Sequence, residues 1–226
     1  MGDRLHIIGT VHVDPASASA VREAILRLRP EVVALELDEA RLYSLQNPGM
    51  AKMSGSAGPS FLAMILLERF AGEVTGSPPG AEMLEAVRAA QSVGARIELI
   101  DMPVYSTIAG LRRIPFKEKL RLAIDSVASL MLLPFGRTEL SKLTERIEDQ
   151  LAAFRNRYPS LSRLLLDVRE EYMTNRLKRI LDSTMGQTVA VVGLGHSTSL
   201  RKRLEQYERG RIFSAGYSWS ITTGAS

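Results

Sequence analysis

Four short apolar runs, at residues 5–8, 32–37, 97–100 and 188–192, constrain the fold of this chain more than any other feature. Each run is nearly continuous and contains β-branched residues, rather than alternating between apolar and polar positions. Continuous runs of this length are typical of strands that are covered on both faces. The sequence therefore predicts an α/β fold, with a largely parallel or mixed central sheet and flanking helices.

The segments between these runs have the signals of crossover helices. Asp14 and Pro15 form a helix start, apolar residues then recur at helical spacing, and Pro30 ends the helix. A second helix is expected over 81–93, where Gly94 supplies the C-terminal stop. Strand, helix and strand therefore follow one another, as in a parallel sheet.

Between about 114 and 181 no strand pattern occurs, and several amphipathic stretches follow one another with a break near 158–160. We predict a helical insertion of three or four helices at about 114–181, between the third and fourth main strands. After the fourth strand we expect a short helix over 197–207 and one more edge strand over 211–221.

Composition indicates an ordinary globular protein, because 45% of the 226 residues are hydrophobic and 24% are charged. We expect a single domain over 1–226. The chain has no cysteine, which excludes disulfide scaffolds, zinc ribbons and cysteine nucleophiles. His6, His12 and His196 are the three imidazoles left for chemistry.

Charge and hydropathy exclude two classes of partner. The net charge is +4, but charges alternate in sign and form no basic block, so we expect no nucleic-acid binding. The longest apolar runs, at 61–67 and 127–135, are far shorter than the ~20 residues of a membrane span. No signal peptide is recognisable, and we expect a cytoplasmic protein without a membrane span.

The run at 127–135 is the best candidate for a homodimer contact, although burial in its own domain is the alternative use.

A Gly-x-x-His pattern occurs twice, from Gly9 to His12 after the first run and from Gly193 to His196 after the fourth. We expect each glycine to let the chain turn tightly as it leaves the strand. The histidine then lies at the carboxyl edge of the sheet, where ligands bind in open parallel sheets.

Carboxylates follow the other two runs at the same edge. Glu36 and Asp38 end the second run, and Asp101 ends the third. Two imidazoles with one or two carboxylates form a site for a divalent metal ion with an open coordination position. Glu36 lies inside an apolar run, where an unpaired charge would cost several kcal/mol, so we expect a metal ion or another cation as its partner.

Each of these residues also has a purely structural interpretation. His6 lies within a strand and is best interpreted as a sheet residue, and a histidine at a strand end is commonly a hydrogen-bonded structural residue. Asp38 and Asp101 can each cap a following helix. Arg41 and Arg169 can be surface or ion-pair arginines.

Three segments in the right order resemble the TraB/PrgY pheromone-shutdown family. They are IIGTVHVDPASASAVREAILRLRPEVVALELDEARL at 7–42, VREEYMTNRLKRIL at 168–181 and VAVVGLGHSTSLRKRL at 189–204. This family is related to the Tiki proteases and, more distantly, to erythromycin esterase and ChaN-like proteins. One departure is Met102-Pro103 after Asp101, where relatives often have a basic residue, and it weakens a role for Asp101.

The resemblance implies a peptidase-like, metal-dependent hydrolase. It suggests His12, Glu36 and His196 as ligands of a divalent ion (manganese, cobalt or zinc), and these three with Arg169 as the catalytic residues. Arg169 is a candidate to stabilise an oxyanion, and Asp38 or Asp101 is a candidate general base. The alternative is a non-catalytic protein that binds and sequesters a small peptide. A third interpretation is a helical interaction module that forms homodimers through the insertion.

Overall fold

The core of the molecule is a four-stranded sheet in the order β1-β4-β2-β3, and every neighbouring pair is parallel. The strands are β1 (Leu5–Thr10), β2 (Val32–Leu35), β3 (Arg96–Leu99) and β4 (Thr188–Gly193). The structure is a computed structural model, and it describes residues 4–10, 15–47, 80–132 and 147–220. The predicted α/β class and parallel sheet are confirmed.

The strands run in register, so their carboxyl ends meet at one edge. Thr188 of β4 is paired with Leu5 on one side and with Val32 on the other. At the far end, Thr10 is opposite Gly193. Whatever follows each strand therefore begins at a common edge of the sheet.

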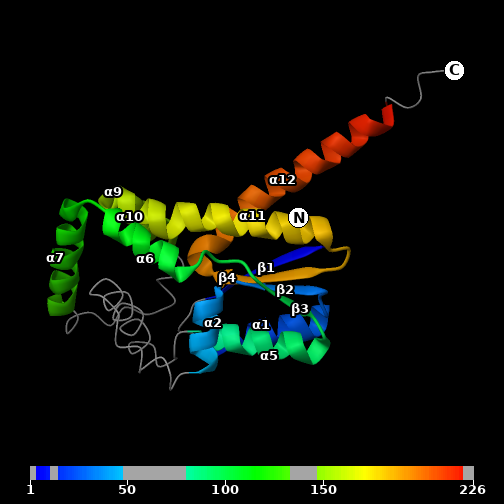
Figure 1. Ribbon diagram of the computed structural model, residues 1–226, viewed down its shortest axis with the longest axis horizontal. Helices are drawn as coiled ribbons and strands as arrows, with labels where there is room; N and C mark the ends of the chain where they lie inside the picture. The colour runs from blue at the N-terminus through cyan, green and yellow to red at the C-terminus, as the bar shows by residue number, and fades with distance from the viewer. Residues whose placement is uncertain (1–3, 11–14, 48–79, 133–146, 221–226) are drawn as a thin grey trace.

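Helices cover both faces of the sheet (Figure 1). One pair packs on each face: α1 (Pro15–Leu28) with α5 (Ala81–Val93), and α11 (Val168–Ser183) with the first part of α12 (Leu194–Ser220). Strand β2 is fully buried because it faces both layers. Its Val33 and Leu35 join the core under α1 and α5, whereas Val32 and Ala34 join the core under α11 and α12. This two-sided burial explains the continuous apolar runs.

The predicted helix boundaries in the first half agree closely with the structure. Helix α1 begins at Pro15, and α5 ends at Gly94, which adopts a left-handed conformation (φ 72°) and donates its amide to Gln91. Helix α2 (Glu39–Gln46) begins after Asp38, whose side chain accepts a hydrogen bond from the Arg41 amide at 2.8 Å. The capping role considered for Asp38 is therefore confirmed.

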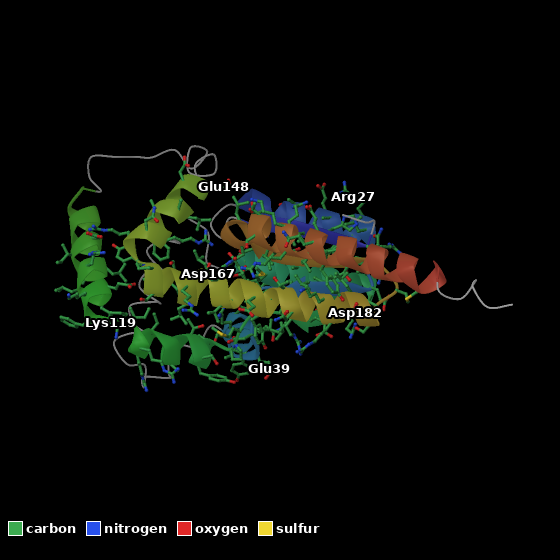
Figure 2. The ribbon with its side chains drawn as sticks, turned by 90° about the horizontal axis from the view of Figure 1, so that it is seen from above. Arg27, Glu39, Lys119, Glu148, Asp167 and Asp182 are labelled. Carbon is green, nitrogen blue, oxygen red and sulfur yellow. The ribbon has the colours of Figure 1, made fainter. Side chains whose placement is uncertain are left out.

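The predicted insertion is helical and has a small core of its own. Its elements, with the preceding helix, are α6 (Val104–Arg113), α7 (Phe116–Leu132), α9 (Ile147–Arg157), α10 (Pro159–Ser162), the π-helical turn η2 (Arg163–Asp167) and α11. Ile114, Tyr158 and Leu161 form its buried cluster. Helix α7 lies apart from the sheet, as the position of Lys119 in Figure 2 shows.

Two sequence predictions about turns and termini are wrong. Residues 211–220 form no edge strand, because α12 continues from the predicted short helix to Ser220 and projects from the rest of the chain (Figure 1). Once a helix has nucleated, each further residue costs little, and this segment has no proline to stop it. The tight turn predicted at Gly9 is absent, because Gly9 lies within β1. Gly193 ends β4 directly before α12, as predicted, and among the described glycines only Gly80 and Gly94 have positive φ.

None of the described helices is both long and apolar enough to cross a lipid bilayer. The side chains of 127–135, the candidate homodimer contact, lie outside the described residues. A homodimer and a single domain over 1–226 therefore remain predictions.

Candidate functional site

The carboxyl edge of the sheet brings together residues from three segments that are far apart in the sequence. Glu36 follows β2, Asp101 follows β3 by two residues, and His196 lies in the first turn of α12, directly after β4. All three are buried, with 3–6% of each residue exposed. His12 lies outside the described residues, but Thr10, two positions before it, is paired with Gly193 at this same edge.

Glu36 is held by two donors. Its Oε2 accepts a hydrogen bond from the Gly193 amide at 2.7 Å, and its Oε1 accepts one from Nη2 of Arg169 at 2.5 Å. The sequence indicated that a buried Glu36 needs a metal ion or another cation as its partner. A cation, the Arg169 guanidinium, fills that role in the structure.

Arg169 also binds Asp101 through two parallel contacts. Its Nε lies 3.0 Å from Oδ1 and its Nη2 lies 2.7 Å from Oδ2 of the carboxylate. Arg41 adds a third contact to Asp101, at 2.6 Å from Oδ2. Asp101 therefore anchors two arginines instead of capping a helix. Both arginines are ion-pair residues, as their structural interpretation predicted.

These charges fix the ionisation of the pair. Burial raises the pKa of Asp101, but Arg169, Arg41 and the Met102 amide together outweigh it and hold the pKa below its ordinary value of 3.8. Burial lowers the pKa of Arg169, but the carboxylates of Glu36 and Asp101 raise it above its usual range. Asp101 is thus a carboxylate and Arg169 a permanent cation at neutral pH.

The position of Arg169 depends on an irregular stretch of helix. The π-helical turn η2 ends directly before α11, of which Arg169 is the second residue. Nη1 of Arg169 donates to the carbonyl oxygen of Leu165, within η2, at 3.3 Å. Such π turns occur frequently at functional sites. This one connects the insertion to the edge of the sheet.

His196 lies between two carboxylates. Its Nε2 is 3.5 Å from Oε1 of Glu36, and its Nδ1 is 3.4 Å from Oε1 of Glu170. Both separations are long for a hydrogen bond, but each ring nitrogen faces a specific oxygen. The structure therefore brings Glu36, Arg169 and His196 together, as the sequence analysis predicted.

Glu170 is the site residue that the sequence analysis missed. It is only 1% exposed, and its Oε2 accepts a hydrogen bond from the Ser199 hydroxyl at 2.5 Å. Burial raises the pKa of Glu170, but hydrogen bonds from His196 and Ser199 and the charge of Arg155 hold it below 4.5. A usable signal was present in the sequence. Glu170 shares the helical spacing of the buried residues Met173 and Leu177, so it is an acidic residue on an apolar face.

His6 takes no part in this arrangement. It lies within β1, and its Nε2 is buried without a hydrogen-bond partner among the described residues. Its interpretation as a sheet residue is consistent with this placement.

Comparison with known proteins identifies the family. The model of the TraB/PrgY/gumN family matches residues 1–209. The chain belongs to this family. An uncharacterized protein of Methanocaldococcus jannaschii is 30% identical over 217 residues, which cover 91% of this chain and 54% of that protein.

The TraB domain-containing proteins of Homo sapiens and Mus musculus are 26% and 25% identical over 235 residues, which cover 89% of this chain and 62% of each relative. The chain thus spans between about half and three-fifths of the length of these curated relatives. These names give the TraB domain but no substrate and no cofactor.

The metal ion implied by the TraB resemblance can be tested against the donors present. Within the described stretches, no three histidine, aspartate or glutamate side chains lie close enough together to hold a metal ion. Glu36 and His196 supply two donors, 3.5 Å apart. With metal–ligand bonds of about 2.1 Å, two neighbouring ligands of a tetrahedral ion lie about 3.4 Å apart. The separation of these two donors is compatible with two ligands of one ion, and His12 is the remaining candidate ligand.

Proposed function

We propose that this TraB-family protein is a metal-dependent hydrolase that acts on peptides, with His12, Glu36 and His196 as the ligands of a divalent ion. The observation that supports it best is the approach of His196 Nε2 to Glu36 Oε1, at 3.5 Å, on the sheet edge where parallel folds bind ligands. His196 and Glu36 come from segments that are far apart in the sequence.

A bound divalent ion lowers the pKa of its water toward neutrality and so supplies a nucleophile. Manganese, cobalt and zinc each suit a site of imidazole and carboxylate ligands. A carboxylate has about four acceptor positions, and hydrogen bonds from Arg169 and Gly193 occupy two of those of Glu36. The remaining lone pair on each oxygen is available to a metal ion.

Arg169 orients Glu36 in this proposal. Four of its five N–H groups point to Asp101, Glu36 and the Leu165 carbonyl, which leaves one for a substrate oxygen. Its contribution to an oxyanion is therefore a single N–H group, and its larger role is to hold two buried carboxylates in place.

The two candidates for a general base have other partners. Asp38 accepts hydrogen bonds from the Arg41 and Val104 amides, one at each oxygen. Asp101 is bound by two arginines. These contacts disfavour both carboxylates as bases, so we assign the proton of the attacking water to neither of them.

Metal analysis tests the proposal most directly. The protein is purified without chelators or a histidine tag, and bound metals are measured by inductively coupled plasma mass spectrometry. We expect about one ion per chain, lost in His196→Ala and retained in the control His6→Gln, which changes the histidine remote from the edge. A parent protein that takes up no manganese, cobalt or zinc contradicts the proposal.

A second experiment separates hydrolysis from capture. The metal-loaded protein is incubated with a defined peptide mixture, and the products are analysed by mass spectrometry. Fragments that disappear in His196→Ala support the hydrolase. Intact peptide retained by the protein supports the alternative of a sequestering protein.

A further inference from the structure

Glu170 is a buried charged residue next to the candidate site, and the described contact that links it to Glu36 runs through His196. Its carboxylate is 1% exposed and lies 3.4 Å from Nδ1 of the ring. A structural carboxylate at such a depth needs partners, and Ser199 provides one at 2.5 Å. Two arginines, Arg155 and Arg203, lie further away, at 3.8 and 3.7 Å.

We propose that Glu170 is a positioning residue that keeps a proton of His196 on Nδ1, and so directs Nε2 toward Glu36. The significance of this tautomer rests on the proposed function, because a metal ligand must present a nitrogen without a proton. The tautomer itself is a property of the metal-free protein and is measurable without any activity.

The choice between the two nitrogens follows from the charges that face them. Each nitrogen faces a carboxylate, which only accepts hydrogen bonds, while neutral imidazole has one proton to give. Glu36 is already compensated by Arg169, whose guanidinium touches Oε1 at 2.5 Å and whose side chain is 16% exposed. The Glu36 oxygen therefore has less need of the ring proton.

Glu170 is compensated less well by its arginines. Arg155 and Arg203 lie beyond hydrogen-bond distance of its oxygens, and their side chains are 40% and 41% exposed, so water screens their charges. The oxygen facing Nδ1 accepts no other hydrogen bond from the described residues. The proton is thus stabilised more by Glu170 than by Glu36.

Helix geometry makes this contact a fixed one. Glu170 lies in the first turn of α11, and His196 and Ser199 lie three residues apart on α12, so both face the same neighbour. Met173 of α11 and Leu200 of α12 belong to the same buried cluster on one face of the sheet. Carboxylates that bind the other ring nitrogen of a metal-binding histidine orient the ring, and their loss typically lowers metal affinity by about 10–100-fold.

Nitrogen NMR of [15N]histidine-labelled protein, recorded without metal at neutral pH, tests the assignment. The chain has three histidines, and His196→Gln identifies the signals of this ring. We expect one protonated and one unprotonated nitrogen, with the proton on Nδ1. A ring protonated on Nε2 alone overturns the proposal.

Variants then test the role of the carboxylate. Glu170→Gln keeps the size of the side chain but removes its charge, and we expect the Nδ1-protonated population to fall. Ser199→Ala, which removes the hydroxyl that holds Glu170, should act in the same direction. The matched control Glu171→Gln changes the exposed neighbouring carboxylate and should leave the tautomer as it is. If the Nδ1-protonated population of His196 is the same in Glu170→Gln as in the parent, the proposal is overturned.

Calorimetric titration with manganese, cobalt and zinc separates this inference from the proposed function. We expect Glu170→Gln to bind metal about 10–100-fold more weakly than the parent. If the parent and Glu170→Gln bind metal with equal affinity, Glu170 does not position His196 as a metal ligand. A parent that binds none of the three ions refutes the metal-dependent function, whereas the tautomer measurement then still decides whether Glu170 positions the proton.

Discussion

Arg169 donates a hydrogen bond to Glu36 at 2.5 Å across a sequence separation of 133 residues. The contact joins α11 to the end of β2, and through Asp101 it also reaches the end of β3. One buried guanidinium thus holds the loops of two strands on the edge where His196 lies. The stability of the sheet edge and the geometry of the site depend on the same side chain.

Replacing Arg169 should therefore destabilise the whole protein. Arg169→Met leaves Glu36 and Asp101 buried with their principal cation removed, and breaking a buried ion pair in this way costs about 3–5 kcal/mol. The free energy of unfolding from urea titrations measures the loss. Arg169→Lys keeps the charge but not the two-pronged contact to Asp101, and we expect an intermediate value. An Arg169→Met protein as stable as the parent would show that the ion pairs contribute nothing.

Stability should fall as the pH is lowered into the acidic range. The pKa values of Asp101 and Glu170 lie below the ordinary 3.8 and 4.5, so the unfolded chain binds protons at a higher pH than the folded protein does. Their contribution is complete above about pH 4.5 and is lost as the pH falls through the folded-state values. Urea unfolding between neutral pH and about pH 3 tests this. Asp101→Asn should be less stable throughout and show a shallower loss.

Much of the fold was predictable because burial on two faces leaves a clear pattern. All four apolar runs are strands with ends within two residues of the expected positions, and Glu36, Arg169 and His196 meet as the motifs suggested. Parallel strands place their carboxyl ends together, so residues after each run needed no further information to be placed near one another.

The rest depends on packing that sequence patterns record poorly. The helical spacing places Glu170 on the apolar face of α11, but only the structure shows its contact with His196. The extent of α12 was missed because Gly210 and the polar, aromatic residues after it also fit an edge strand. The role of Gly9 was misjudged because glycine serves both tight turns and close approaches, which the sequence does not distinguish.

Asp125 offers a direct test of the electrostatics outside the site. Its carboxylate accepts hydrogen bonds from Arg157 at 2.8 Å and from the Tyr158 hydroxyl, and these contacts lower its pKa to about 2. Carbon NMR of the side-chain carboxyl groups measures this pKa. In Arg157→Gln we expect it to rise toward the ordinary value of 3.8. A parent pKa near 3.8 would show that the contacts between α7 and the α9–α10 junction do not persist in solution.

The two Gly-x-x-His segments allow a matched test of close packing. A β-carbon added to Gly9 would lie 3.0 Å from both Leu194 Cδ1 and Ser197 Oγ, at the start of α12, whereas one added to Gly195 would meet Leu151 at an ordinary 3.9 Å. We expect Gly9→Ala to destabilise the protein by about 1–3 kcal/mol, as overpacking does.

Gly195→Ala, within α12, should be neutral or stabilising by up to about 1 kcal/mol through helix propensity. Urea unfolding of both variants measures the difference. Equal stabilities would mean that the side chains of Leu194 and Ser197 shift without cost, so that the close approach at Gly9 does not fix the position of α12 over the sheet edge.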